Sequence, residues 1–392
     1  MIPGRARVTM MAVVMGLVMA PHVMAQSDSA DVRPLVAGGA DDRSRLTGLF
    51  GRIALGGYLE ANGTWEREDG ATTELGFELT RWNLLASTSL SDRVRVFSEV
   101  EFEEGGEEVI VELAQLDLLL HRAVNLRGGL LLLPLGRYNL THDGPRNELP
   151  RRPVAPTELL GVVLSQPGLG AFGDFTMPGG SRQTYELYTV TGFRDGVILE
   201  SPEGTRLSAG RRNFEDANAS PAFVGRTEWS PSEKLGIGLS GYHGAWNSWR
   251  IEGVEVEERQ DLTAGVLDAY AKAFGFALSA EGALVEVDVP DGLTGLFASR
   301  QYGFYAEASH GFGRALIPGL PDSWFTAAAR VDAVDFDRDL AGDSFRSITL
   351  GLNFRPLASS VIKLAWMRGE SRDRFNNLSN VGQVQLGLAS YF

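Results

Sequence analysis

After Gly51, apolar and polar residues alternate in short segments along almost the whole chain, and turn residues separate one segment from the next. Successive side chains of a β-strand point to opposite faces, so this alternation is typical of strands with one apolar and one polar face. The last segment is the clearest: Leu386 and Leu388 share one face, and Gln383 and Gln385 share the other. The pattern predicts an all-β fold.

Sixteen segments show this alternation of apolar and polar residues. We predict strands at 51–64, 74–88, 92–103, 107–120, 124–135, 168–176, 182–194, 220–230, 235–247, 260–272, 275–288, 300–311, 323–334, 344–355, 360–370 and 381–392. Many exceed the ~9–11 residues that a tilted strand needs to cross the hydrocarbon layer of a membrane. Their length therefore favours strands that span a membrane.

The predicted connections alternate between short turns after even-numbered strands and longer polar loops after odd-numbered strands. The longest loops lie at about 136–167 and 195–219, and the connection at 312–322 is the main exception. Short periplasmic turns and long external loops are the layout of an outer-membrane barrel. We therefore predict one transmembrane antiparallel β-barrel of about 16 strands over residues 51–392.

Composition fits this prediction and excludes several other classes. The mean hydropathy of −0.07 is the average expected of a wall with one lipid face and one water face. The chain has no cysteine, which excludes disulfide scaffolds, cysteine-ligated metal sites and thiol nucleophiles. A net charge of −14 argues against a general nucleic-acid-binding protein, which needs a basic face.

The N-terminus has the features of an export signal. Arg5 and Arg7 precede a mostly apolar run from Val8 to Ala20, and small residues near Ala25 suit cleavage after that residue. We predict a signal peptide at 1–25 and a polar periplasmic lead-in at 26–50. An exported barrel is expected in the bacterial outer membrane, among its lipids and lipopolysaccharide.

Two segments break the alternation. Glu112 is at an even-numbered position, as are Leu116 and Leu118, so alternation would place this acid on their apolar face. Within 75–86 the apolar residues change from odd-numbered to even-numbered positions. A β-bulge, which adds one residue to a strand, produces this change. We predict a bulge in each segment, with an error of register as the alternative.

The run from Gly51 to about Gly170 resembles the start of the phosphate-selective porin O and P family. The matching pieces are GGYLEA (56–61), FELTRWNL (77–84), SEVEFE (98–103), VELAQLDL (111–118) and NLRGGLLLLPLGRYNLTHDGPRNELPRRP (125–153). The resemblance implies a sixteen-stranded outer-membrane porin, commonly a homotrimer, whose long loop narrows the pore. It implies a passive channel for small polar or ionic solutes, including anions such as phosphate. This chain departs from the family in having only three lysines, Lys234, Lys272 and Lys363.

The C-terminal strand resembles the signal that outer-membrane proteins present to the barrel-assembly machinery. Its candidate residues are Leu386, Leu388, Tyr391 and Phe392.

The candidate pore residues are charged groups of both signs on the long loop at 136–167 and on strand faces assigned to the lumen. Opposed charges in a constriction orient polar solutes and bias ion passage. The loop candidates are Arg137, His142, Asp143, Arg146, Glu148, Arg151 and Arg152, and the wall candidates are Arg52, Glu60, Arg95, Glu99 and Glu101. The alternative is a surface loop with solvated charges.

Two other function classes stay open at this stage: a closed barrel that serves as an anchor or adhesin, and a lipid-hydrolysing barrel enzyme. The enzyme is disfavoured because His243, with Ser240 and Ser248 nearby, lacks any nucleophile motif. We expect no enzyme activity and no cofactor.

No metal site is expected either. The stretch 335–343 begins like a calcium loop, but it has Leu340 and Arg346 where glycine and an acid are needed. The acidic loops at 101–108 and 252–261 are expected to be solvated, with binding of divalent cations or lipopolysaccharide as the alternative.

Overall fold

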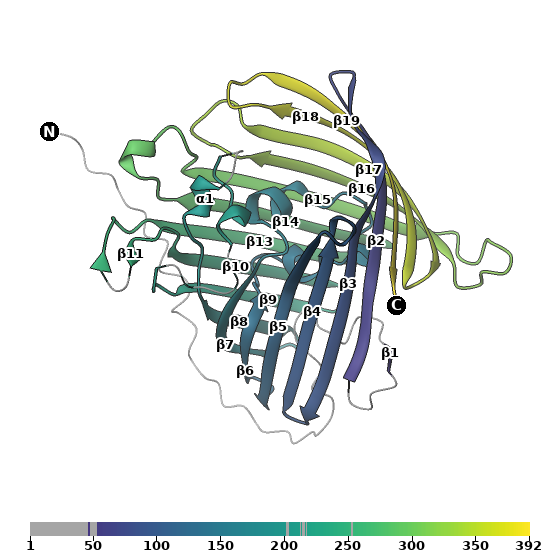
Figure 1. The fold of residues 1–392 in the computed structure, drawn as a ribbon. Coiled ribbons are helices and arrows are strands. Elements are labelled where there is room, and N and C mark those ends of the chain that lie inside the picture. The colour runs from purple at the N-terminus through teal and green to yellow at the C-terminus, as the bar shows by residue number, and fades with distance from the viewer. Residues whose placement is uncertain are drawn as a thin grey trace. The chain divides into compact units, whose positions relative to one another are not determined.

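A computed structural model describes residues 46–47, 53–200, 204–211, 213, 216, 218–251 and 254–392. Within these ranges, sixteen long antiparallel strands form one sheet that closes on itself through pairing of β19 with β2 (Figure 1). The strands are β2 (Ile53–Glu68), β3 (Ala71–Ser91), β4 (Val94–Glu103), β5 (Glu108–His121), β6 (Val124–Leu132), β7 (Ser165–Thr176), β8 (Arg182–Val190), β9 (Ala222–Ser232), β10 (Leu235–Ala245), β13 (Asp261–Ala273), β14 (Phe276–Val287), β15 (Arg300–Phe312), β16 (Trp324–Asp335), β17 (Ser344–Leu357), β18 (Ser360–Arg372) and β19 (Leu378–Tyr391). Each predicted segment overlaps one of them, which confirms the predicted barrel.

The remaining elements are short. The two-residue strand β1 (Leu46–Thr47) pairs with β2, and β11 (Arg250–Ile251) pairs with β12 (Val254–Glu255). The helical turns are η2 (Glu104–Gly106), η3 (Tyr138–Leu140), η4 (Gly144–Arg146), η5 (Ala155–Leu160), α1 (Gly196–Leu199), η6 (Ser208–Gly210) and η7 (Asp291–Leu293). No helix in the described part of the chain is long and apolar enough to cross a membrane.

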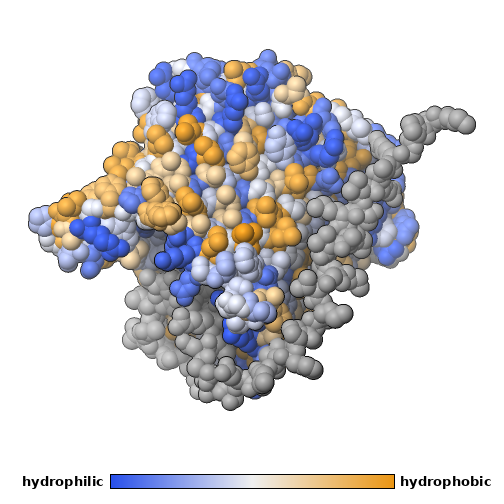
Figure 2. Space-filling model, turned by 180° about the vertical axis from the view of Figure 1, so that it is seen from behind, coloured by the Kyte–Doolittle hydropathy of each residue, from blue (hydrophilic) through white to orange (hydrophobic). Residues whose placement is uncertain are grey.

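The alternation in sequence becomes an outer and an inner surface. On β18, Ile362 and Leu364 are exposed on the outside, whereas Lys363 between them is 1% exposed and points inward. Figure 2 shows apolar residues over much of the barrel wall on the face it presents. A closed sheet satisfies its backbone hydrogen bonds within itself, which is the requirement for a wall surrounded by hydrocarbon.

Both predicted bulges are present. Arg81 pairs with Glu60 and Leu79 with Ala61, so Thr80 is the extra residue in β3. In β5, Glu112 is the extra residue, because its neighbours Leu113 and Val111 pair with consecutive residues of β4. Each bulge reverses the parity of its strand and keeps the apolar side chains on the outer face.

The predicted long loop after the first strand is wrong. β2 and β3 continue to Glu68 and Ala71 and are joined by Asp69 and Gly70, whose φ angles are 46° and 89°. Positive φ at both central residues is typical of a type I′ hairpin turn, and Asp-Gly favours it. The backbone N–H of Asn380 donates to the Asp69 carboxylate at 2.9 Å and lowers the pKa of that carboxyl.

The main apolar core lies inside the barrel rather than between layers. Inward-facing residues of β8–β16, such as Val224, Val266 and Val285, pack against Leu159 and Leu160 of the loop between β6 and β7. Further members, Phe193, Val197, Ile198 and Leu207, come from the connection between β8 and β9. Two long connections therefore fold onto the inner surface of the wall.

Candidate functional site

The candidate site is built around the connection between β6 and β7, residues 133–164, called here the inner loop. Its two ends lie side by side, because the Leu133 N–H donates to the Leu164 carbonyl at 2.9 Å. The buried Asn139 side chain fastens both ends: its amide nitrogen donates to the Leu133 carbonyl at 2.8 Å and to the Leu164 carbonyl at 2.9 Å. The loop thus leaves the wall and returns to it at one point.

The first part of the inner loop contacts the wall from β9 to β14. The Gly136 N–H donates to Ser240 Oγ on β10 at 2.8 Å, and the Tyr138 N–H donates to Glu281 Oε2 on β14 at 2.9 Å. Arg137 donates to Glu228 on β9 at 3.3 Å, and its guanidinium lies 4.1 Å from the Tyr270 ring centroid.

The middle of the inner loop contacts the wall from β16 to β18. Lys363 Nζ donates to the Gly144 carbonyl at 2.8 Å, and Arg355 donates to the Pro145 carbonyl at 3.1 Å. Arg330 donates to the Arg152 carbonyl at 3.3 Å. Contacts on both sides of the barrel place the inner loop across the lumen, where Figure 1 shows helical turns within the ring of strands.

A group of buried acids lies where the inner loop meets β2–β5. Arg81 on β3 is the central cation: its guanidinium lies 3.2 Å from Glu60 and 3.1 Å from Glu101. The Asn83 amide donates to Glu99 and to the bulged Glu112, each at 3.1 Å. These acids are at most 2% exposed. Buried charges of this kind need partners, which the neighbouring strands and the inner loop supply.

The inner loop carries its own charges into this group. The Tyr391 hydroxyl donates to Asp143 Oδ2 at 2.6 Å, and Arg146 Nε donates to the same hydroxyl oxygen at 3.2 Å. His142 Nε2 lies 3.5 Å from Glu112 Oε2, and burial lowers the pKa of His142. Neutral imidazole is therefore the form that suits this position.

Five charged residues of the inner loop keep part of their side chains open to solvent, and Glu158 in η5 is one of them. Arg137, Arg146 and Arg151 are 25%, 25% and 31% exposed, and Glu148 is 21% exposed. Glu148 accepts hydrogen bonds from Asn353 at 2.8 Å and from Arg355 at 3.2 Å. A polar solute in the lumen would meet these groups first.

The other predicted residues fall in different surroundings. Arg152 is buried, and its Nε and Nη2 have no hydrogen-bond partner among the described residues. Arg95 lies half-buried near the start of β4. Arg52 lies outside the described residues.

Sequence reasoning missed several members of the site. Arg81, Asn83 and Arg355 were not among the candidates, and Glu112 was noticed only as an irregularity. For Arg81, Asn83 and Glu112 the signal was the bulge in β3 or β5, which changes which positions of the strand face inward. For Arg355 the signal was the simple alternation along β17, where Asn353 also faces inward.

The serine and histidine considered for an enzyme do not meet. Ser240 faces the lumen and is bonded to the inner loop, whereas His243 is exposed and bonded to Thr263 on the outside. Ser248 Oγ donates to Asp195 instead. Within the described ranges, no three His, Asp or Glu side chains are grouped so as to hold a metal ion.

Gly144 provides a test of how closely the inner loop is seated. A Cβ at this position would lie 2.7 Å from Glu60 Oε2. We expect Gly144→Ala to reduce the free energy of unfolding by roughly 1–3 kcal/mol, as overpacking commonly does, and to increase proteolysis of the inner loop. Gly382→Ala is the matched control, because no atom lies within 4 Å of its added Cβ. Equal behaviour of the two variants would mean that the loop is not held against β2.

No family model matches the chain. A protein of Aquifex aeolicus (strain VF5), described as uncharacterized, is 24% identical over 358 residues, which are 83% of this chain and 77% of that protein.

Solved structures share the fold. The outer membrane channel DcaP of Acinetobacter baumannii has a TM-score of 0.57 at 11% identity, over 87% of this chain and 97% of its own. The anion-selective porin from Comamonas acidovorans has a TM-score of 0.54 at 14% identity, over 87% and 99%. OmpT of Vibrio cholerae in its trimer form has a TM-score of 0.50 at 8% identity, over 87% and 100%. At these identities the likeness establishes a porin-like channel fold.

Proposed function

We propose that this chain is an outer-membrane porin, a passive diffusion channel for small polar or ionic solutes whose narrowest part is formed by the inner loop. The observation that carries the proposal is the course of that loop across the lumen, with contacts to β10 on one side and β18 on the other. The shared fold with an outer membrane channel and an anion-selective porin supports it.

In this mechanism the barrel and inner loop exclude large solutes, and charged side chains replace part of the hydration shell of small ones. Arg146, Arg151 and Glu148 are among the loop charges with the required exposure. Arginine binds carboxylate and phosphate groups through two parallel hydrogen bonds, so anions such as phosphate belong to the proposed solutes. No covalent chemistry is involved.

The proposal includes export through a cleaved signal peptide, membership of the phosphate-selective porin O and P family, assembly as a homotrimer and contact with lipopolysaccharide. The barrel-assembly machinery would recognise the last strand. Leu386 and Leu388 face outward there, and the Phe392 N–H donates to the Gly57 carbonyl at 3.0 Å. Tyr391 instead faces inward and binds Asp143.

Liposome swelling tests the proposed activity. Proteoliposomes should swell in solutions of small sugars and small organic anions and should remain unswollen in large oligosaccharides. Folded protein that admits no solute would overturn the proposal.

The second candidate is a closed barrel that acts as an anchor or adhesin. The apolar cluster within β8–β16 and the burial of Arg330 and Lys363 to 1–2% exposure favour it. Absence of swelling together with retained binding of cells or surfaces would support this candidate.

The charges of the inner loop give a prediction about selectivity. We expect Arg146→Glu combined with Arg151→Glu to move the reversal potential in a salt gradient toward cation preference, because four units of negative charge are added beside the path. The matched control is Arg300→Glu combined with Arg338→Glu, which changes the net charge equally at the external ends of other strands. An unchanged reversal potential in the loop variant would place these arginines outside the path.

A further inference from the structure

The external end of the β2–β3 hairpin, residues 65–80, forms a projection that we call the flap. Pairing between β3 and β4 ends at Arg81 and Glu103, so the flap part of β3 is paired with β2 alone among the described strands. The other edge of β2 is covered by β19 up to Glu68. The flap therefore presents one unpaired strand edge, which is a template for pairing with another protein.

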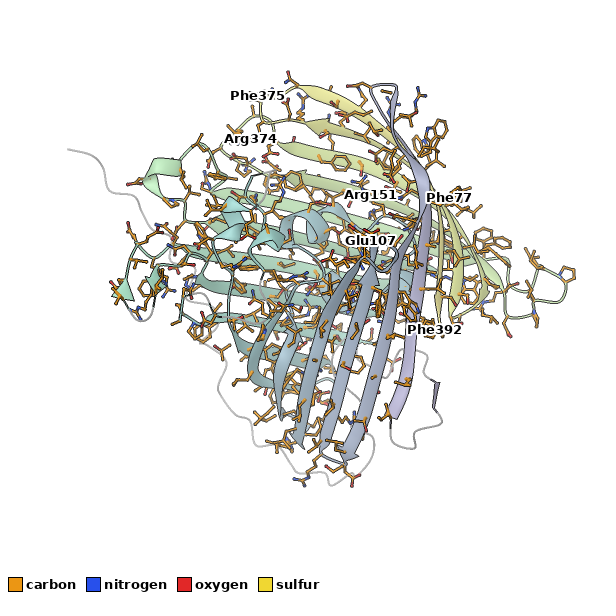
Figure 3. All side chains as sticks on the ribbon, viewed as in Figure 1. Phe77, Glu107, Arg151, Arg374, Phe375 and Phe392 are labelled. Carbon is orange, nitrogen blue, oxygen red and sulfur yellow. The ribbon has the colours of Figure 1, made fainter. Side chains whose placement is uncertain are left out.

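The outer face of the flap is apolar and unusually exposed. Phe77 is 89% exposed, Leu75 77%, Trp65 47% and Leu79 43%. The bulge at Thr80 keeps these side chains in one outward row with the lower part of β3. Figure 3 labels Phe77 on the outer side of the hairpin.

The apolar row on β3 is longer than the apolar band of a membrane barrel. From Leu75 to Leu90 it runs about 45 Å along the strand at ~3.3 Å per residue, or about 35 Å across the membrane at the ~40° tilt of barrel strands, whose apolar band is ~25 Å tall. About 10 Å of it therefore lies beyond the hydrocarbon band. Hydrocarbon chains do not cover this part, and hydrocarbon cannot pair with its free backbone groups.

The surroundings of the flap favour a protein over the phosphate groups of a glycolipid. Glu104 in η2, Glu107 after it and Glu108 at the start of β5 are exposed next to the free edge of the flap, and Glu74 and Glu78 lie on the face of the flap opposite Phe77. An anionic headgroup would be repelled by these acids. A partner must also stand beside the barrel in the same membrane and rise to the same height, which a second copy of this chain does.

The same wall offers a counterpart on the neighbouring hairpin, β18–β19. The external end of β18–β19 exposes Phe375 to 87% and carries Arg368, Arg372 and Arg374 alongside two acids, Glu370 and Asp373. Figure 3 shows Arg374 and Phe375 at this end, apart from Phe77 and Glu107. Two unlike patches on one wall are what a closed ring of identical subunits uses, since each copy gives one patch and receives the other.

We propose that the flap of one copy packs against the external end of β18–β19 of a second copy in a closed ring. The proposal rests on the homo-oligomer given under Proposed function and names its contact surface. Phe77 and Leu75 are the apolar anchors, and the exposed Glu104, Glu107 and Glu108 beside the flap face the arginines of the neighbouring copy.

Cross-linking tests this interface directly, because the chain has no cysteine. Two single-cysteine variants, Phe77→Cys with one affinity tag and Phe375→Cys with another, are co-expressed. Oxidation should produce a disulfide-linked pair carrying both tags. In the control, Phe77→Cys is co-expressed with Phe274→Cys, whose position is 98% exposed on the opposite, periplasmic side, and no mixed pair is expected.

The oligomeric state gives the second measurement. Leu75→Ser combined with Phe77→Ser should convert most of the protein from oligomer to folded monomer in light scattering, with Phe274→Ser remaining oligomeric. An oligomer that persists in the flap variant, without mixed cross-links, would place the interface elsewhere. A monomeric wild-type protein would contradict the oligomer itself. Solute uptake by single barrels would be unchanged in both cases, so failure of the interface is distinguishable from failure of the proposed channel.

Discussion

Excising residues 137–160 is expected to raise the conductance of a single barrel several-fold. The excision joins Gly136 to Gly161 and removes the part of the inner loop that contacts β9, β14 and β16–β19. Strands β6 and β7 should keep their pairing, because the hydrogen bond between Leu133 and Leu164 lies outside the excised segment. Conductance rises with the open cross-section, so removal of a loop from the lumen has a larger effect than any single substitution.

A second, shorter excision shows whether cutting and rejoining a connection is by itself responsible. Residues 250–255 are removed from the connection between β10 and β13, where the Val256 N–H donates to the Trp249 carbonyl at 2.9 Å and the ends again lie together. This variant should conduct like the wild type. If the two excisions have equal conductance and both barrels are folded, the inner loop does not limit the path.

Replacing Lys363 by methionine is expected to reduce the free energy of unfolding by roughly 1–3 kcal/mol, the usual cost of leaving a buried hydrogen-bond acceptor without its donor. Lys363 is 1% exposed, donates to the Gly144 carbonyl and interacts electrostatically with Glu60. Its loss leaves the Glu60 carboxylate with less positive charge nearby and releases the inner loop from β18. Urea unfolding in detergent measures the change, and protease cleavage within the inner loop should increase in parallel.

Two variants separate this effect from a general loss of charge. Lys234→Met removes an exposed lysine and should change stability little. Glu60→Gln added to Lys363→Met should recover part of the lost stability, because the buried carboxylate that has lost one of its neighbouring positive charges is then absent. A double variant no more stable than Lys363→Met would show that the two side chains are not coupled.

The wall of the barrel could be predicted from sequence because the signal is local. Each inward residue is flanked by outward ones, so the faces of β10 and β18 follow from alternation alone. The bulge at Glu112 was visible for the same reason, as a change of parity within one strand. The Asp69–Gly70 turn was missed because the polar residues around it suggested a loop, although Asp-Gly between two strands is a hairpin signal.

The interior could not be predicted in the same way. Alternation shows that Val224 and Val266 face inward, but it does not show that the inner loop and the β8–β9 connection cover them. The partners of Asp143 and Gly144 come from residues more than two hundred positions away, Tyr391 and Lys363. Such contacts depend on how the closed barrel brings distant strands around one loop, and no local pattern records them.

Single-channel recording of the purified wild-type protein in planar bilayers tests the central claim most directly. A porin should give discrete ohmic steps, and a salt gradient across the bilayer should give a reversal potential that reports the sign of the lumenal field. Protein that is fully folded in detergent and inserts into the bilayer without any conductance step would contradict the account and favour a closed barrel.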